Sequence, residues 1–271
     1  LRSIAQKVAH SVHEPLIKAF RSSMDLSYKA DRRDIVTVHD KAAEVIIVDQ
    51  LLTMVPDSQV AGEEGGAQGQ GDLKWFVDPI DGTANFACGL PSWCVSIGAV
   101  LDDEIIAGAI WDPMGGNMFS ADTGGAYLGD NLLKTQAMPD QVDATLLASY
   151  PSARDLAADG KDVALDRFGR LMEDFSGVRR NGSAALGIAH VAAGWADGAI
   201  GVGINPWDVA AALLILEKSG GTYRPINWDA DKRSHPAFEA PGYAAIGAGG
   251  SYPTLLTIAD EIENTRSSVA R

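Results

Sequence analysis

The chain has 271 residues, of which 46% are hydrophobic and 21% charged, as in an ordinary globular protein with a large buried core. The 36 acidic residues outnumber the 22 lysines and arginines, so the formal net charge is −14. Because nucleic acids and anionic membranes attract basic proteins, this charge argues against both as partners. No segment approaches about 18 uninterrupted apolar residues, so we expect no membrane span.

The first part of the chain predicts two helices. Apolar residues recur at helical spacing over residues 1–24. After a polar loop, Thr37 is placed to cap a second helix that ends near Met54, with Glu44 and Asp49 on its solvent side. The two cysteines further along, Cys88 and Cys94, show neither metal-ligand spacing nor a disulfide pattern, so we expect free thiols and a cytoplasmic location, where thiols stay reduced.

The most informative stretch is residues 75–86, Trp-Phe-Val-Asp-Pro-Ile-Asp-Gly-Thr-Ala-Asn-Phe. Its apolar start predicts the end of a buried strand, and Pro79 should stop that strand because it cannot donate a ladder hydrogen bond. Asp78 and Asp81 flank the proline, and Gly82-Thr83 predicts a turn into a short helix. Two acids beside the N–H groups of a helix start favour divalent cations and a phosphate group.

The remaining elements separate into two halves. A glycine-rich run at 67–72 predicts a mobile loop, and strands at 94–101 and 104–111 predict a hairpin in a largely antiparallel sheet. The second half alternates strands and helices, which favours an α/β arrangement. Its expected strands are 145–149, 178–180, 198–202 and 243–247, and its helices are 163–175, 183–193 (with a Ser183 cap), 207–219 and 253–262. We place a boundary near residue 140, between halves 1–140 and 141–271 of one compact unit.

Several acidic motifs stand out, namely residues 34–40, Gly62-Glu63-Glu64, the Asp78/Asp81 pair and Pro206-Trp207-Asp208. Taken alone, Asp208 reads as a helix cap and the two glutamates as a solvated turn. A further acid, in Asp112-Pro113, is interpreted as a turn at a hairpin end. Together, the other motifs resemble the oxygen-ligand sets that hold Mg²⁺.

These motifs, in this order, resemble the inositol monophosphatase family, within the fructose-1,6-bisphosphatase-like superfamily of Mg²⁺-dependent, often Li⁺-sensitive phosphatases. The first family signature, Trp-x-x-Asp-Pro-Ile-Asp-Gly-Thr-x-Asn-Phe, is matched from Trp75 to Phe86. The second, Trp-Asp-x-Ala-Ala followed by Gly-Gly, is matched at 207–211 and 220–221. The resemblance implies a mixed α+β and α/β fold, a layered αβαβα sandwich, and a homodimer.

The resemblance also implies a site for two to three Mg²⁺ ions. The metal ligands would be Glu63, Asp78, Asp81, Asp208 and the backbone carbonyl of Ile80. Glu64 would not bind a metal ion itself but would support the residues that do. Asp40 would hold the weakest ion through water.

For catalysis and binding, the resemblance implies roles for further residues. Thr83, hydrogen-bonded to Asp40, would help Glu63 deprotonate the attacking water, and Lys29 would lie near the metal-bound anion. The alternative for Lys29 is a solvated loop residue. The phosphate and substrate would be bound by Asp81, Gly82, Thr83, Ser183 and Ala184.

The implied activity is hydrolysis of a small phosphate monoester, inositol monophosphate or a related sugar or polyol phosphate. However, Gly201 stands where inositol-specific members carry a glutamate that contacts the inositol hydroxyls. Histidinol phosphate and fructose 1,6-bisphosphate therefore stay open as substrates, the latter with Arg179-Arg180 as a second phosphate site. A non-catalytic protein-interaction role is a further alternative.

Overall fold

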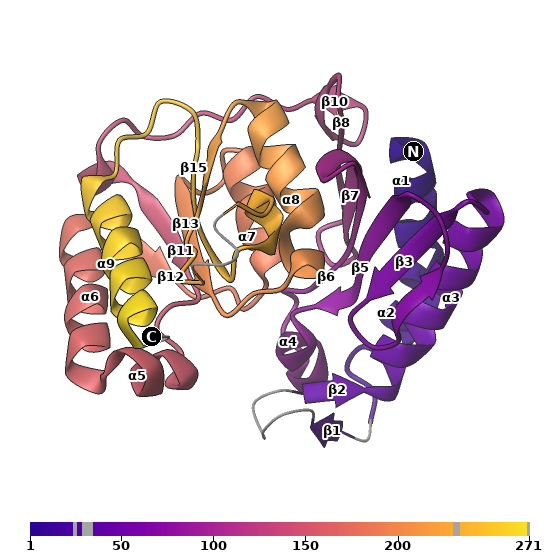
Figure 1. Cartoon of the computed structure of the whole chain (residues 1–271), viewed down its shortest axis with the longest axis horizontal. Helices are drawn as coiled ribbons and strands as arrows, with labels where there is room; N and C mark the ends of the chain where they lie inside the picture. Colours follow the sequence, from indigo (N-terminus) through magenta and orange to yellow (C-terminus); the bar gives the residue numbers. More distant parts are fainter. Residues whose placement is uncertain (24–25, 29–34, 230–233, 270–271) are drawn as a thin grey trace.

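A computed structural model describes residues 1–23, 26–28, 35–229 and 234–269. Within these ranges helices and sheets alternate as helix, sheet, helix, sheet and helix layers (Figure 1). The helices are α1 (Arg2–Ser11), α2 (His13–Ala19), α3 (Val38–Met54), α4 (Thr83–Cys88), α5 (Ala153–Asp159), α6 (Lys161–Asp174), α7 (Ala184–Ala192), α8 (Pro206–Ser219) and α9 (Pro253–Val269), with 3-10 turns η1 (Gln141–Asp143) and η3 (Ala237–Glu239). The predicted αβαβα sandwich is confirmed.

The larger sheet has the strand order β10-β9-β8-β7-β6-β5-β3-β4 and is antiparallel except where β3 runs parallel to β5. Its strands are β3 (Ser58–Gly62), β4 (Gly66–Gly69), β5 (Leu73–Asp81), β6 (Cys94–Leu101), β7 (Glu104–Asp112), β8 (Asn117–Asp122), β9 (Gly125–Leu128) and β10 (Asn131–Leu132). Helices α1, α2 and α3 bury one face of this sheet, and α7 and α8 cover the other. A separate pair, β1 (Leu26–Tyr28) and β2 (Ile35–Thr37), precedes α3.

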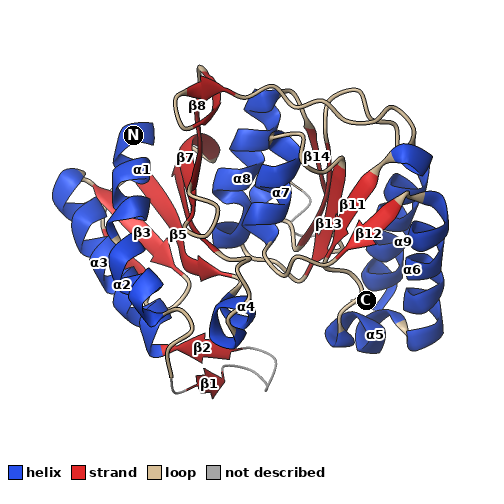
Figure 2. Cartoon of the chain, turned by 180° about the vertical axis from the view of Figure 1, so that it is seen from behind, coloured by secondary structure: helices blue, strands red, loops and turns tan. Residues whose placement is uncertain are grey.

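The smaller sheet has the order β12-β11-β13-β15-β14. Its strands are β11 (Thr145–Ala148), β12 (Gly177–Arg179), β13 (Gly198–Val202), β14 (Thr222–Pro225) and β15 (Gly242–Ile246). Strand β11 is parallel to β12 and β13, whereas β15 is antiparallel to both of its neighbours. One face packs on α7 and α8 and the other on α6 and α9 (Figure 2). Helices α7 and α8 thus form the layer shared by the two sheets.

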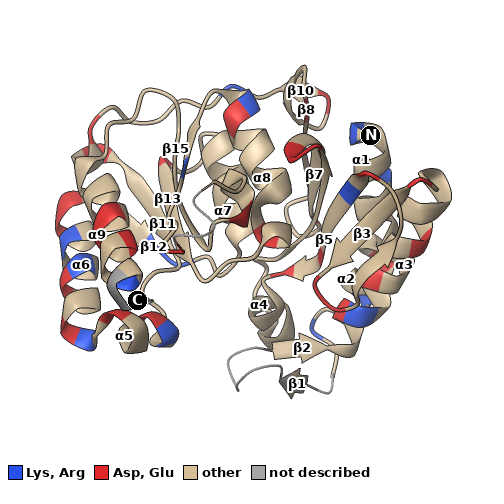
Figure 3. Cartoon of the chain, viewed as in Figure 1, with Lys and Arg blue, Asp and Glu red and all other residues tan. Residues whose placement is uncertain are grey.

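Charge follows these layers. Figure 3 shows acidic and basic residues mainly on the outer helices α3, α6 and α9, while α7 and α8 carry few. This pattern is expected, because α8 is buried along almost its whole length between two sheets. No helix within the described ranges is long and apolar enough to cross a membrane. Both cysteines are free thiols, as expected.

Two expected elements differ from the structure. The N-terminal helix breaks at Val12 into α1 and α2, because Pro15 cannot donate a hydrogen bond to Ser11 and its ring would collide with that carbonyl. The run at 67–72 is not simply a loop, since β4 pairs with β3 through Gly69. A β-carbon at Gly69 would lie 2.6 Å from Leu52 Cδ2 and from Ser58 O, so the glycines permit this close edge pairing.

Helix α8 lies unusually close to the larger sheet. A β-carbon at Gly98 in β6 would lie 2.9 Å from Ala210 Cβ, and one at Gly108 in β7 would lie 2.9 Å from Ala211 Cα. Small residues on both sides therefore set the distance between the helix and the sheet. Since α8 begins with an acidic motif, this packing also sets where Asp208 lies.

We expect Gly108→Ala to lower the free energy of unfolding by about 1–3 kcal/mol, because the added methyl group overpacks the contact with α8. Urea unfolding measures the change. The control is Gly169→Ala in α6, where a β-carbon meets nothing within 4 Å. This control should be neutral or stabilising by about 0.5–1 kcal/mol. Equal stability of the Gly108 variant and the wild type would contradict the packing argument.

Candidate active site

The site is centred on the end of β5. Contrary to expectation, Pro79 does not stop this strand, which continues to Asp81. The register shifts between the pairs Asp78↔Ser96 and Asp81↔Cys94, so the proline lies in a bulge that needs no N–H donor. The bulge brings Asp78 and Asp81, both at least 90% buried, to the same end of the sheet.

Asp81 joins the two halves of the chain. Its Oδ2 accepts hydrogen bonds from Ser183 Oγ at 2.5 Å and from the Ala185 backbone N–H at 2.7 Å, while Ala184 N lies 3.4 Å from Oδ1. These donors form the first turn of α7, where the helix dipole favours a negative charge. Ser183 also accepts from Leu186 N, which confirms the predicted cap.

The turn after β5 also contacts the second half. Gly82 has a φ of +98°, and a β-carbon there would lie 2.9 Å from Ser92 O, so only glycine fits. Asn85 in α4 donates through Nδ2 to Ser92 O at 2.6 Å and to Asn181 O at 2.7 Å. The geometry of this turn thus depends on the loop that leads into α7.

Asp40 lies in the first turn of α3 and is fully buried. It accepts from the N–H of Thr37 at 2.8 Å and from the Thr37 hydroxyl at 2.6 Å, so it completes a capping box. Its other oxygen accepts from Thr83 Oγ1 at 3.0 Å, and the Thr83 hydroxyl also lies 3.0 Å from Ile80 O. The predicted Thr83–Asp40 hydrogen bond is therefore present.

The turn that carries Glu63 and Glu64 is held by Glu44. Glu44 Oε2 accepts from Glu64 N at 2.8 Å, and Oε1 accepts from Gly65 N at 2.5 Å. The assignment of Glu44 to the solvent side of α3 was wrong: it is only 2% exposed, because it lies one helical turn after Asp40 on the same buried face. Asp49 is exposed, as expected.

Asp208 comes from the first turn of α8. Asn205 is the N-cap, and Asp208 Oδ2 accepts from the Asn205 N–H at 2.8 Å in a second capping box. The capping alternative for Asp208 is therefore part of the structure.

Burial raises the pKa values of Asp78, Asp81 and Asp208, and neighbouring negative charges add to the rise for Asp78 and Asp208. Burial, followed by the negative charges of Glu63, Asp81 and Asp208, raises the pKa of Asp78 well above its usual value. Burial and the charge of Asp81 do the same to the pKa of Asp208. The pKa of Asp81 is also raised by burial, although its hydrogen bonds from α7 oppose the shift. The cluster is therefore electrostatically strained unless a positive charge enters it.

The donor chemistry fits a divalent cation. All the groups are carboxylate or carbonyl oxygens, which hard cations prefer. Ion pairs such as Arg2–Asp122 and Arg167–Asp159 lie in other parts of the protein. However, no three histidine, cysteine, aspartate or glutamate side chains in the described ranges already stand in metal-coordinating positions. The carboxylates instead turn toward backbone donors, Asp81 to α7 and Asp208 to Asn205.

Three further residues considered from the sequence are Lys29, Asp112 and Arg180. Lys29 lies outside the described residues. The Asp112 carboxylate accepts from the N–H groups of Met114 and Gly115, which confirms its interpretation as a turn. Arg180 donates to the carbonyls of Ser149 and Pro151.

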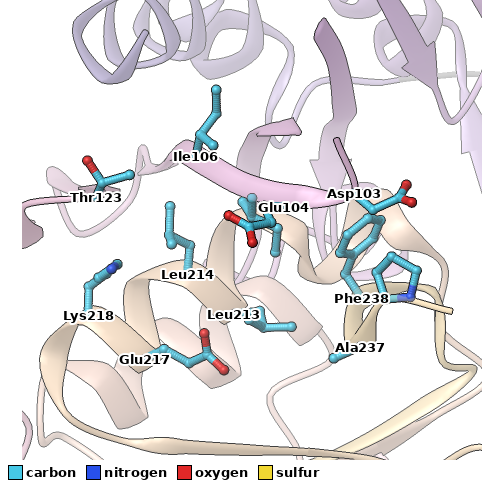
Figure 4. Close-up of a pocket in the computed structure, with 12 residues that line it drawn as sticks. Asp103, Glu104, Ile106, Thr123, Leu213, Leu214, Glu217, Lys218, Ala237 and Phe238 are labelled. Carbon is cyan, nitrogen blue, oxygen red and sulfur yellow. The ribbon is translucent and has the colours of Figure 1, made fainter. Parts of the chain in front are cut away.

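The hollow shown in Figure 4 is not the active site. It has a volume of about 340 Å³ and lies between the β6–β7 turn, the last turns of α8 and η3. Leu213, Leu214 and Lys218 line it, whereas Asp208 lies at the opposite end of the same helix. Its lining includes the acids Asp103, Glu104 and Glu217, none of which belongs to the cluster at the end of β5.

Comparison with known proteins agrees with this geometry. The family model described as "Inositol monophosphatase family" matches residues 1–259. The chain belongs to the inositol monophosphatase family. It is 36% identical over 222 residues to the Nus factor SuhB of Xylella fastidiosa, covering 81% of this chain and 79% of that protein.

Two further relatives support the same family. The fructose-1,6-bisphosphatase/inositol-1-monophosphatase of Aquifex aeolicus is 35% identical over 195 residues, covering 70% of this chain and 72% of that protein. The structure of a Thermotoga maritima IMPase superposes with a TM-score of 0.79 at 27% identity, covering 99% of this chain and 97% of the other. Membership of this family of metal-dependent phosphatases accounts for the acidic cluster.

Sequence reasoning missed two residues near the site. Glu44 was misplaced because the buried positions of α3 include an acid, which a hydrophobic pattern reads as solvent-facing. Tyr243 received no role, since nothing in its local sequence distinguishes it from a core aromatic.

We expect Glu44→Ala to destabilise the protein by about 1–3 kcal/mol, because two backbone N–H groups lose their buried acceptor. Urea unfolding measures this loss. Asp49→Ala removes an exposed acid from the same helix and should change the free energy of unfolding by less than about 0.5 kcal/mol. Similar effects of the two substitutions would contradict the assigned role of Glu44.

Proposed function

We propose that the protein is a Mg²⁺-dependent phosphomonoesterase that hydrolyses inositol monophosphate or a related small sugar or polyol phosphate. The observation that carries this proposal is the convergence of Asp78, Asp81 and Asp208 from two halves of the chain, where burial raises all three pKa values and neighbouring negative charges raise those of Asp78 and Asp208 further. Such a cluster is suited to binding cations that in turn bind a phosphate dianion.

In this proposal, the ions would be held by Glu63, Asp78, Asp81, Asp208 and the carbonyl of Ile80. When bound, two to three Mg²⁺ ions neutralise the phosphate charge, lower the pKa of water and stabilise the departing alkoxide. Glu64 supports Glu63, whose turn is fixed by Glu44. Asp40 would contribute to the weakest site through water.

The chain's own residues position the nucleophile. The Thr83 hydroxyl donates to Asp40, so its oxygen lone pairs are available to accept a hydrogen bond from the attacking water. Glu63 then accepts the water proton as general base. Because Asp40 is itself held by Thr37, the orientation of Thr83 is fixed before substrate binds.

The phosphate and the alcohol are bound on either side of this centre. Backbone N–H groups of Gly82 and Thr83 donate to phosphate oxygens, in a turn that only glycine can form. Ser183 and Ala184 would contact the substrate, and the structure shows that both also contact Asp81. Lys29 would lie near the bound anion.

The preference for inositol phosphates and related esters is supported by the names of relatives, one of which includes both fructose-1,6-bisphosphatase and inositol-1-monophosphatase. We also propose Li⁺ sensitivity, a homodimer and a cytoplasmic location, with neither nucleic acid nor membrane as partner. A second candidate, a protein-interaction role, is favoured by the name Nus factor that several relatives carry.

A panel of phosphate esters tests the reaction. We expect Mg²⁺-dependent phosphate release, abolished by EDTA and restored by excess Mg²⁺, from at least one of inositol 1-phosphate, glycerol 2-phosphate, fructose 1,6-bisphosphate and histidinol phosphate. Release that persists in EDTA would contradict metal dependence. Absence of release from every ester would favour the protein-interaction role.

We expect Asp78→Asn to lower kcat by about 10²-fold or more, because the shared ligand is lost. The same variant should lose the rise in Tm that Mg²⁺ gives the wild type, because a ligand stabilises only a state that binds it. Its Tm without Mg²⁺ should equal or exceed that of the wild type, since a buried repelled charge is removed.

The control for Asp78→Asn is Asp122→Asn, which removes an acid that pairs with Arg2 at 2.9 Å, away from the cluster. It should keep both activity and the Mg²⁺-induced rise in Tm. Full activity of the Asp78 variant with unchanged Mg²⁺ dependence would overturn the metal assignment.

A further inference from the structure

Gly201 lies directly beneath an aromatic ring. It is in β13, and its partner in the antiparallel pairing with β15 is Tyr243. A β-carbon at Gly201 would lie 2.6 Å from Tyr243 Cε1, 3.0 Å from Tyr243 Cζ and 2.9 Å from Ser149 Oγ. The ring of Tyr243 therefore occupies the volume into which any side chain at position 201 would extend.

A second tyrosine fixes this ring. Tyr223 in β14 lies diagonally across from Tyr243 on the same face of the sheet, and the two rings stack with centroids 5.7 Å apart and planes inclined by 17°. Both rings are at least 90% buried. The ring of Tyr243 is thus held between the stacked Tyr223 and the glycine, with little freedom to move away.

The hydroxyl of Tyr243 lies toward the catalytic acids. A β-carbon at Gly187, in the first turns of α7, would lie 3.8 Å from this hydroxyl, and α7 is the helix whose start binds Asp81. After burial, the negative charges of Asp81 and Asp208 are the causes that raise the pKa of the Tyr243 phenol. The phenol is therefore a neutral hydrogen-bonding group close to the acidic cluster.

The two tyrosine hydroxyls differ in access. Within the described ranges, Tyr223 Oη is fully enclosed and has no hydrogen-bond partner. Tyr243 Oη does not belong to this group of fully enclosed atoms without a partner. The Tyr243 hydroxyl also makes no hydrogen bond to a described residue, so it has both an unused bonding capacity and some open surface. A molecule in the site can supply its missing partner.

We propose that Tyr243, seated over Gly201, is the specificity-determining residue that binds the alcohol part of the substrate through its uncharged hydroxyl. It favours phosphate esters whose alcohol carries hydroxyl groups beside the ester oxygen, because such a group pairs with the phenol. An alcohol of the same shape without hydroxyls leaves the phenol unpaired when water is displaced. This inference rests on the proposed function, since it presupposes a phosphate ester.

The test compares inositol 1-phosphate with cyclohexyl phosphate, which has the same six-membered carbon ring without the additional hydroxyls. Tyr243→Phe should raise KM for inositol 1-phosphate about three- to tenfold with little change in kcat, as expected for one neutral hydrogen bond. Its KM for cyclohexyl phosphate should stay unchanged. Equal changes for both esters, or no change for either, would overturn the assignment.

Two further variants distinguish a direct contact between Tyr243 and the substrate from a purely packing role of the tyrosine pair. Tyr223→Phe removes the enclosed hydroxyl and keeps the stacked ring, so KM for both esters should match the wild type. Gly201→Ala should push the Tyr243 ring aside and raise KM for inositol 1-phosphate more than for cyclohexyl phosphate. If Tyr223→Phe weakened inositol 1-phosphate as much as Tyr243→Phe does, the tyrosine pair would act only as packing and the proposal would fail.

Calorimetric binding of both esters in the presence of Mg²⁺ distinguishes failure of this inference from failure of the proposed reaction. If the wild type binds the esters without hydrolysing them, the reaction is overturned, and the loss of inositol 1-phosphate affinity in Tyr243→Phe still decides the inference. If the wild type binds neither ester, both proposals are overturned.

Discussion

The acidic site depends on the bond between the Asp81 carboxylate and the first turn of α7. Asp81 belongs to the larger sheet, whereas Ser183 and Ala185, its donors, lead the helix shared with the smaller sheet. A charge-assisted bond to a helix N-terminus is strong and directional, so it fixes how the end of β5 faces the second half of the chain. Asn85 repeats this connection through Asn181. The acids can therefore meet only when both halves are folded and packed.

That arrangement has an electrostatic cost. Burial and the surrounding negative charges raise the pKa of Asp78. Glycine and alanine contacts hold α8 close to β6 and β7, so Asp208 in the first turn of that helix cannot easily move away from the other acids. Packing thus holds together groups that would otherwise repel one another. A cation would remove this strain, which explains why a protein of net charge −14 can still be suited to an anionic substrate.

Local sequence was sufficient for much of this structure. The capping roles of Thr37 and Ser183 follow from short-range chemistry, and the alternation of strands and helices after residue 145 predicted strands β11, β12, β13 and β15 of the smaller sheet but missed β14. Reasoning failed where distant contacts decide the outcome. Pro79 continues a strand because β6 accommodates a bulge, and Glu44 is buried because it serves a turn 20 residues away. The metal ligands themselves were suggested by the family resemblance, and their roles stay predictions.

The position of Tyr243 indicates how chemistry and substrate choice can be separated in this fold. The acids lie on β5, α3 and α8, whereas Gly201 and Tyr243 are paired on the smaller sheet. A change at this strand pair alters the group that faces the alcohol but leaves the hydrogen bonds of Asp40, Asp81 and Asp208 untouched. Because the tyrosine ring excludes any side chain at position 201, the two positions constrain each other: a larger residue there requires a smaller or displaced one at 243. Substrate preference is then a property of the pair, and neither residue alone determines it.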